Sequence, residues 1–224
     1  MSTARKWVIS GVAFVFVLFF VVAFAAPEPD TTSTMESPRR PIAVEVTPTP
    51  VSPPLSVPTP DVVIPASAPT RLEIPVIGLD GAITEYTLAM IMKNGGYDPQ
   101  PWRTAIAWDT SIEGGLAGTD ATNTVYLYGH SWIEETVFNG IRYLQVGDIA
   151  RVTTANGTLC YVAHDTFTVR KGDYKSHPEL TRAVPNRLVL VTCNRPDGYD
   201  PNSVTIENAV VILQLDQQMT NAGC

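Results

Sequence analysis

The chain has 224 residues and a formal net charge of −7, with 17% charged and 45% hydrophobic residues. It carries no basic stripe, so nucleic acid is not an expected partner. The three cysteines, Cys160, Cys193 and Cys224, show no Cys-x-x-Cys spacing, which excludes a zinc ribbon and a thioredoxin-like motif. The length leaves room for one ordinary domain with additional segments.

An apolar segment from Trp7 to Ala26 follows the basic pair Arg5-Lys6. At the rise of a helix, this segment can cross a bilayer core of about 30 Å. Because the positive charges precede it, the amino terminus is expected in the cytoplasm and the rest outside the cell. Ala23-Phe24-Ala25 also resembles a signal-peptide cleavage site, but the segment is long for a signal peptide. We favour an uncleaved anchor over residues 1–26, and both alternatives export the remaining chain.

Residues 27–69 are rich in proline, threonine and serine. Such a composition cannot bury a core and favours an extended, polyproline-like chain. We expect a stiff linker that holds the following domain away from the membrane, with a disordered tail as the alternative. Val62-Val63-Ile64, near its end, could dock on the domain as an extra edge segment.

Residues 70–224 are expected to fold as a mainly β domain. Short apolar runs are separated by Gly, Pro and Asn turns, and Asn156-Gly157 is a strong hairpin signal. Helical turns are predicted only over 138–144 and 178–183, and 83–92 is ambiguous. This pattern predicts a closed β-barrel or a sandwich. The predicted strands are an edge strand with Pro75 over 71–80, then 104–108, 124–128, 149–154, 159–169, 188–193 and 204–215.

The strand from Leu188 to Cys193 ends in a candidate nucleophile. Its run of apolar and β-branched residues is typical of a buried strand. A thiol at a strand end is held by the sheet and remains accessible to substrate. A second strand end, Tyr128-Gly129-His130, supplies the imidazole that a catalytic thiol needs. Cys193 and His130 are therefore candidate catalytic residues, although a cysteine in a strand is more often a small buried hydrophobe.

The order of four motifs resembles the sortases, the cysteine transpeptidases of Gram-positive cell surfaces. The similarity extends over residues 70–215, and the preceding anchor and linker fit the same family. The motifs are the first strand Leu72-Glu73-Ile74-Pro75-Val76-Ile77-Gly78-Leu79-Asp80, then Tyr128-Gly129-His130, Leu144-Gln145-Val146-Gly147-Asp148 and Leu190-Val191-Thr192-Cys193.

The resemblance implies an eight-stranded β-barrel with short helices, in which Cys193 and His130 face each other across a groove. It implies that Cys193 cleaves an LPxTG-like sorting signal of secreted proteins and holds the acyl group as a thioester. His130 would protonate the leaving amine and deprotonate the incoming one. The acceptor amine would belong to a peptidoglycan precursor or to a pilin lysine.

The strand after the cysteine departs from the family pattern. Sortases place an arginine there, where it steadies the substrate or the oxyanion, whereas no Arg or Lys follows Arg195 in this chain. Arg195 is the candidate replacement, and a solvated loop arginine is the alternative. Thr192 and Asn194, through a hydroxyl or a backbone N–H, are candidates for the remaining oxyanion stabilisation. The gap points to a slow or divergent enzyme.

The remaining candidate residues are two cysteines and two acidic residues, and none of them is expected to take part in catalysis. Cys160 lies in a predicted strand and is expected in the core, and Cys224 could pair with it or with another chain. Asp173 and Glu179 could bind calcium, as some sortases do, but their spacing matches no calcium loop, so we predict no metal or other cofactor.

Together these residues predict a sortase-like cysteine transpeptidase outside the cell, anchored through residues 7–26 with its amino terminus in the cytoplasm. Its predicted catalytic residues are Cys193, His130 and Arg195. One alternative is a catalytically weak or inactive sortase-like surface module that binds peptides, because the absent arginine would also mark such a protein. Another is a plain hydrolase, in which water rather than an amine resolves the thioester.

Overall fold

The computed structural model describes residues 60–95, 102–200 and 202–224. The predicted membrane anchor and most of the predicted linker lie outside these ranges. Within the described ranges, no helix has both the length and the apolar character needed to cross a membrane.

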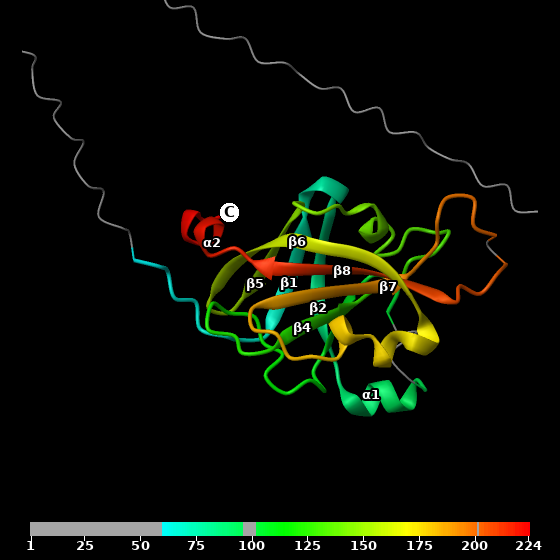
Figure 1. The fold of residues 1–224 in the computed structure, drawn as a ribbon, viewed down its shortest axis with the longest axis horizontal. Helices are drawn as coiled ribbons and strands as arrows, with labels where there is room; N and C mark the ends of the chain where they lie inside the picture. The colour runs from blue at the N-terminus through cyan, green and yellow to red at the C-terminus, as the bar shows by residue number, and fades with distance from the viewer. Residues whose placement is uncertain (1–59, 96–101, 201) are drawn as a thin grey trace, which may run out of the picture. The chain divides into compact units, whose positions relative to one another are not determined.

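Eight strands form a closed barrel (Figure 1), in the order β1-β2-β3-β4-β7-β8-β6-β5. This arrangement and the short helices confirm the predicted fold class. The strands are β1 (Pro69–Ile74), β2 (Leu79–Tyr86), β3 (Ile106–Asp109), β4 (Thr124–Tyr128), β5 (Ile149–Thr154), β6 (Gly157–Arg170), β7 (Arg187–Cys193) and β8 (Glu207–Leu215). The helices are η1 (Pro75–Ile77), α1 (Leu88–Lys93), η2 (Ile141–Tyr143), η3 (Lys171–Ser176), η4 (Pro178–Leu180) and α2 (Gln217–Ala222).

Strands β4 and β7 lie side by side in parallel, and both are buried on two faces. Leu188 and Leu190 of β7 belong to the main core cluster, whereas Val189 and Val191 belong to a second cluster. Because successive side chains of a strand point to opposite faces, each cluster covers one face of β7. Covering elements on both faces explain why β7 reads as a continuous apolar run.

The segment 71–80, predicted as one edge strand, is divided in the structure. Pro75 begins the 3-10 helix η1 between β1 and β2, a position where its missing N–H costs no hydrogen bond. Strand β1 also pairs with both β2 and β5, so it is not an edge strand. The prediction was wrong because a closed barrel leaves no edge for the proline to occupy.

The ambiguous segment 83–92 forms the end of β2 and then helix α1. Thr87 caps this helix, since its Oγ1 accepts a hydrogen bond from the Met90 N–H at 3.3 Å. The last strand, β8, begins at Glu207 rather than at 204.

The end of the predicted linker packs against the barrel. Ile64 is only 7% exposed and joins the main core cluster. Its N–H donates to Thr119 Oγ1 at 2.9 Å, and the Val62 N–H donates to Asn221 Oδ1 at 2.9 Å. The expected docking of this segment is therefore confirmed, through side-chain contacts and one isolated bridge between Ser67 and Ala117 rather than a full strand.

A disulfide joins Cys160 in β6 to Cys224 beyond helix α2, with a Cα–Cα distance of 5.9 Å. Cys160 is fully buried, as predicted, and the open choice of partner for Cys224 is resolved. Cys193 lies outside this disulfide. Figure 1 shows α2 and the β7–β8 connection at opposite ends of the barrel, so the disulfide is far from the end that carries Cys193.

Candidate functional site

The parallel pairing of β4 with β7 brings together the two strand ends that the sequence singled out. Tyr128 pairs with Val191, and the Gly129 N–H donates to the Val191 carbonyl at 3.2 Å. The Thr192 hydroxyl donates to the Gly129 carbonyl at 2.8 Å. His130 and Cys193 each follow this last pair by two residues, so both lie at the same end of the barrel, and both are half-buried.

The backbone around His130 is held by the loop that follows it. The Phe138 N–H and the Thr136 hydroxyl both donate to the His130 carbonyl at 2.9 Å. The Phe138 ring also packs on Gly129, where a Cβ would lie 2.4 Å from Phe138 Cγ. Only glycine permits this approach, which gives the Gly-His motif a physical reason.

Two tyrosines that pack with β7 line an open cavity. Alternation along the strand places Cys193 on the same face as Val189 and Val191. Tyr126 and Tyr128 of β4 belong to the same cluster and line a cavity of about 520 Å³. Its other walls come from the loop after β3 and from residues 180–183 before β7. Neither Cys193 nor His130 lines this cavity, and Tyr128, at the end of β4, is the lining residue two positions before His130.

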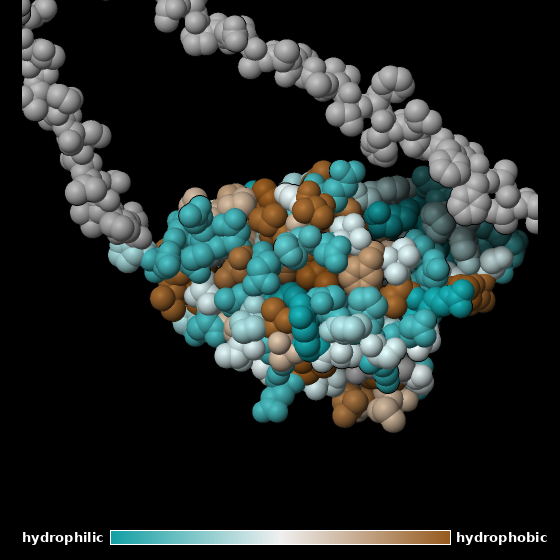
Figure 2. Space-filling view, in the orientation of Figure 1, coloured by the Kyte–Doolittle hydropathy of each residue, from teal (hydrophilic) through white to brown (hydrophobic). Residues whose placement is uncertain are grey.

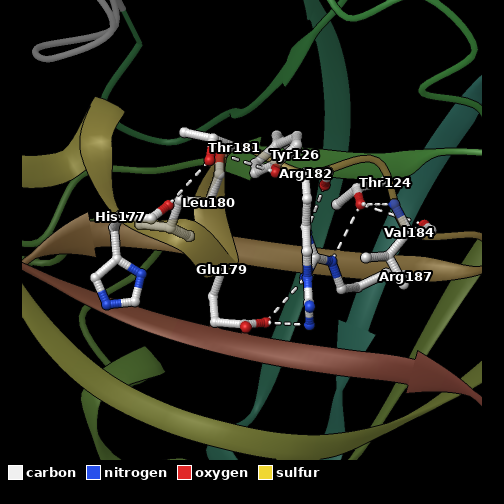
Figure 3. Close-up of polar contacts among 9 residues, drawn as sticks. All are labelled: Thr124, Tyr126, His177, Glu179, Leu180, Thr181, Arg182, Val184 and Arg187. Carbon is white, nitrogen blue, oxygen red and sulfur yellow. Dashed lines mark hydrogen bonds and ion pairs between the residues drawn. The ribbon is translucent and has the colours of Figure 1, made fainter.

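A buried arginine holds one wall of this cavity (Figure 3). Arg187 is 2% exposed, and its Nε donates to Thr124 Oγ1 at 3.1 Å. Its Nη2 donates to the Arg182 carbonyl at 2.9 Å, and its Nη1 lies 3.4 Å from Glu179 Oε2. The Tyr126 hydroxyl adds a bond to the Leu180 carbonyl at 3.1 Å. These contacts fix the β6–β7 connection to the barrel.

The same contacts bear on the calcium suggestion. Glu179 forms ion pairs with Arg182 and Arg187, which occupy the carboxylate that calcium would need. Asp173 lies in η3. In the described part of the chain, no group of three or more His, Cys, Asp or Glu residues could hold a metal ion. The arrangement gives the calcium suggestion no support.

A buried carboxylate also lines the 520 Å³ cavity. Asp109, at the end of β3, is 1% exposed. Burial raises the pKa of this carboxyl, although the Ser111 hydroxyl and N–H, which donate to Oδ1 at 2.5 and 2.9 Å, oppose the shift. The sequence analysis did not single out Asp109, because an aspartate at a strand end before a Ser-containing turn is a common local pattern.

Arg195 connects the loop after Cys193 to the loop after His130. Its side chain is buried, and its Nε donates to the Ser131 carbonyl at 3.1 Å. The guanidinium carbon lies 3.9 Å from the centre of the Trp132 ring and 5.3 Å from that of Tyr199. Arg195 is therefore not a solvated loop residue, and its catalytic role stays a prediction.

A second open cavity, of about 660 Å³, lies on the Arg195 side of the site. It is lined by Arg142, Tyr143, Trp132 and Arg195, among others. Arg142 pairs with Asp197 at 2.8 Å, and hydrogen bonds from Tyr143 and Arg142 lower the pKa of the exposed Asp197 carboxyl. Of these two open cavities, one is thus lined by three tyrosines and four charged residues among others, and the other by two arginines among others.

The two residues proposed for the oxyanion have internal hydrogen-bond partners. The Thr192 hydroxyl is bonded to the Gly129 carbonyl, as described above. The Asn194 N–H donates to the Glu207 carbonyl at 2.9 Å, and its side-chain amide donates to Glu207 Oε2 at 3.2 Å. Either donor would have to exchange its present acceptor to bind a substrate oxygen.

Lys171 is the functional candidate that sequence reasoning missed. Its Nζ lies 3.5 Å from Cys193 Sγ. Residue 171 follows β6, and only the barrel order β7-β8-β6 brings that strand end near the cysteine. The one sequence signal was a lysine two residues after the end of a long predicted strand.

Comparison with known proteins supports the family assignment. A family model for the sortase domain matches residues 72–212, more than half of the chain. Among solved structures, a lid mutant of sortase A from Corynebacterium diphtheriae is similar, with 19% identity and a TM-score of 0.50 over 68% of this chain and 72% of that one. The comparison with curated proteins finds no match.

Two further sortase structures are similar at lower scores. Sortase C-1 from Actinomyces oris has 22% identity and a TM-score of 0.47, over 66% of this chain and 71% of that one. Sortase A from Listeria monocytogenes has 17% identity and a TM-score of 0.46, over 70% of this chain and 88% of that one. The extent of the family match is decisive, and the chain belongs to the sortase family of cysteine transpeptidases.

Proposed function

We propose that this chain is a sortase that works outside the cell, anchored through residues 7–26, with Cys193 as nucleophile and His130 as general acid and base. The observation that carries the proposal is the parallel pairing of β4 and β7, closed by the bond from Thr192 to Gly129. It holds a thiol and an imidazole at neighbouring strand ends, and Tyr128, at the end of β4, lines an open cavity.

The proposed acyl donor is an LPxTG-like sorting signal at the carboxyl end of a secreted protein. Supporting this choice, three tyrosines, Ile112 and Leu180 line the 520 Å³ cavity and suit apolar side chains of an extended peptide, while charged residues of the lining could bind its polar groups. Two of its lining residues, Tyr126 and Tyr128, belong to the cluster on the Cys193 face of β7, so the proposed path of the peptide continues past Tyr128 to the thiol.

The proposed reaction has two acyl transfers. The Cys193 thiolate attacks the carbonyl carbon of the signal's threonine, a C–S bond forms and the C–N bond to the next residue breaks, and the His130 imidazolium gives its proton to the leaving amine. An incoming amine then attacks the thioester, a new C–N bond forms, and the C–S bond breaks. Neutral His130 takes the proton from this amine, which restores thiolate and imidazolium.

The acceptor is proposed to be an amine of a peptidoglycan precursor or of a pilin lysine. The 660 Å³ cavity is the candidate entry for it, because the cavity borders the loop after His130. We propose that Arg195 acts there as a positioning residue, since it joins the loops that follow the two reacting side chains.

The space-filling view is consistent with a domain in contact with water. Over the face shown in Figure 2, hydrophobic and hydrophilic residues are interspersed. Single apolar residues on such a surface need no special function. The case for function therefore depends on the two strand ends and their cavities.

The test uses the full chain in detergent micelles, mixed with a set of LPxTG-type peptides. We expect the mass of the wild-type protein to increase by the mass of the acyl part of one peptide. Hydroxylamine should remove this acyl group, and the mass of Cys193→Ala should not increase. Peptide binding without any adduct, while Cys193 is still alkylated by iodoacetamide, would contradict the enzyme proposal and favour the peptide-binding module.

A further inference from the structure

The strand that follows the cysteine carries no positive charge. Strand β8 contains neither arginine nor lysine, and neither does any residue after Arg195. The Arg195 guanidinium is engaged by Ser131 and Trp132. A cysteine nucleophile reacts as its thiolate, so the source of positive charge near Cys193 matters for its reactivity.

The barrel order brings a lysine to this position. Strand β8 lies between β6 and β7, with Arg170 paired to Glu207 and Cys193 paired to Asn208. The Lys171 N–H extends this ladder by donating to the Ile206 carbonyl at 2.9 Å. The backbone of Lys171 is thus fixed at the start of β8, and its side chain brings Nζ to 3.5 Å from Cys193 Sγ.

We propose that Lys171 is a catalytic residue whose ammonium group stabilises the Cys193 thiolate, both as nucleophile and as leaving group. This proposal rests on the acyl-transfer function proposed above. In this proposal Lys171 transfers no proton, because His130 performs the proton transfers. Both Lys171 and Cys193 are half-buried, so their attraction is screened less than that of a fully exposed pair.

Other ionisable groups lie on the elements that meet around the thiol. They include His130 after β4, Arg195 in the loop after β7 and Glu207 at the start of β8. Glu207 accepts a hydrogen bond from the Asn194 amide. The contribution of His130 must be separated from that of Lys171, since an imidazolium would stabilise a thiolate in the same way.

The experiment measures the rate of Cys193 alkylation by iodoacetamide against pH, in the full chain in micelles without reductant. The other two cysteines form a disulfide, so the reaction reports on Cys193. We expect Lys171→Met and Lys171→Gln to raise the midpoint pH by about one unit, which means about tenfold less thiolate below it. Lys171→Arg should keep most of the wild-type profile.

Two controls separate charge from structure. Arg170→Met removes the neighbouring exposed cation and should leave the midpoint unchanged. The shift caused by Lys171→Met should persist in a His130→Ala background. Lys171→Gln keeps an N–H donor without the charge, so a wild-type midpoint in this variant would overturn the electrostatic role.

Two further outcomes would also overturn the proposal. One is a midpoint that stays unchanged in Lys171→Met. The other is an acyl group on Lys171 that resists hydroxylamine after turnover, because an acylated lysine is neutral. The alkylation assay needs no substrate, so its result is independent of whether the sorting-signal peptides react.

Discussion

The Thr192 hydroxyl donates a 2.8 Å hydrogen bond to the carbonyl of Gly129, and this bond joins the strand end that carries the nucleophile to the one that carries the imidazole. Both residues are buried, so the bond is protected from competition with water. A threonine directly before the cysteine therefore has a structural purpose that a valine of similar shape cannot serve.

Thr192→Val should remove this bond and leave the buried Gly129 carbonyl without the hydroxyl donor. We expect a loss of about 1 to 2 kcal/mol in the free energy of unfolding, measured by urea denaturation, together with slower acylation. Thr158→Val is the matched control, because Thr158 lies exposed on β6. Equal unfolding midpoints for Thr192→Val and the wild type would contradict the structural purpose.

Arg195 offers a test between catalysis and positioning. Arg195→Met should slow acylation about tenfold, or ~1.4 kcal/mol in activation free energy, with the main effect on kcat. If Arg195 acts by stacking on Trp132, then Trp132→Leu should reproduce much of this loss. Glu135→Gln, an exposed change in the same loop, is the control.

A wild-type acylation rate in Trp132→Leu would instead support the catalytic role of Arg195 that was expected from the sequence. If Trp132→Leu acylates at the wild-type rate while Arg195→Met is slow, the guanidinium itself acts on the reacting groups. Single-turnover kinetics with a sorting-signal peptide separates this step from the later transfer to the amine.

Much of the fold could be predicted because its signals are local. The apolar run of β7 and the hairpin around Asn156-Gly157 need only neighbouring residues to be recognised. The candidate pair Cys193 and His130 followed from two strand ends that each carried a reactive side chain. Their placement side by side depends on the β4–β7 pairing, which only the resemblance to a family could anticipate.

The elements that were missed depend on distant partners. Pro75 was expected in an edge strand, but barrel closure makes it the start of η1 instead. Lys171 is 22 residues from Cys193 in sequence and reaches it across β8. No spacing rule describes a contact between the ends of two strands that a third strand separates.

The disulfide should stabilise the domain without affecting the nucleophile. The disulfide joins residues with a sequence separation of 64, and in the chain-entropy account such a cross-link raises the free energy of unfolding by up to about 4 kcal/mol. Cys224→Ser should therefore lower the urea midpoint, and reduction of the wild type should have the same effect. The alkylation rate of Cys193 in the folded protein should stay unchanged, since α2 lies at the other end of the barrel (Figure 1). A slower rate would show that the two ends are coupled.

Asp109 should make stability depend on pH in a defined direction. Burial raises the pKa of its carboxyl above the ordinary value of 3.8, so the folded state holds the proton more tightly than the unfolded state. The stability from this group is fully present below pH 3.8 and is lost as pH rises through the folded pKa. Asp109→Asn removes the ionisation and keeps an oxygen that accepts from Ser111.

The difference in unfolding free energy, Asp109→Asn minus wild type, should therefore increase as pH rises from 4 to 8, measured by urea denaturation at each pH. Ser111→Ala provides a second variant, because the Ser111 hydroxyl lowers the pKa of Asp109 and its loss should raise that pKa further. When both proteins of the comparison also carry Ser111→Ala, the difference in unfolding free energy should therefore keep increasing up to a higher pH. A difference that is constant with pH would show that Asp109 ionises as readily in the folded barrel as in the unfolded chain.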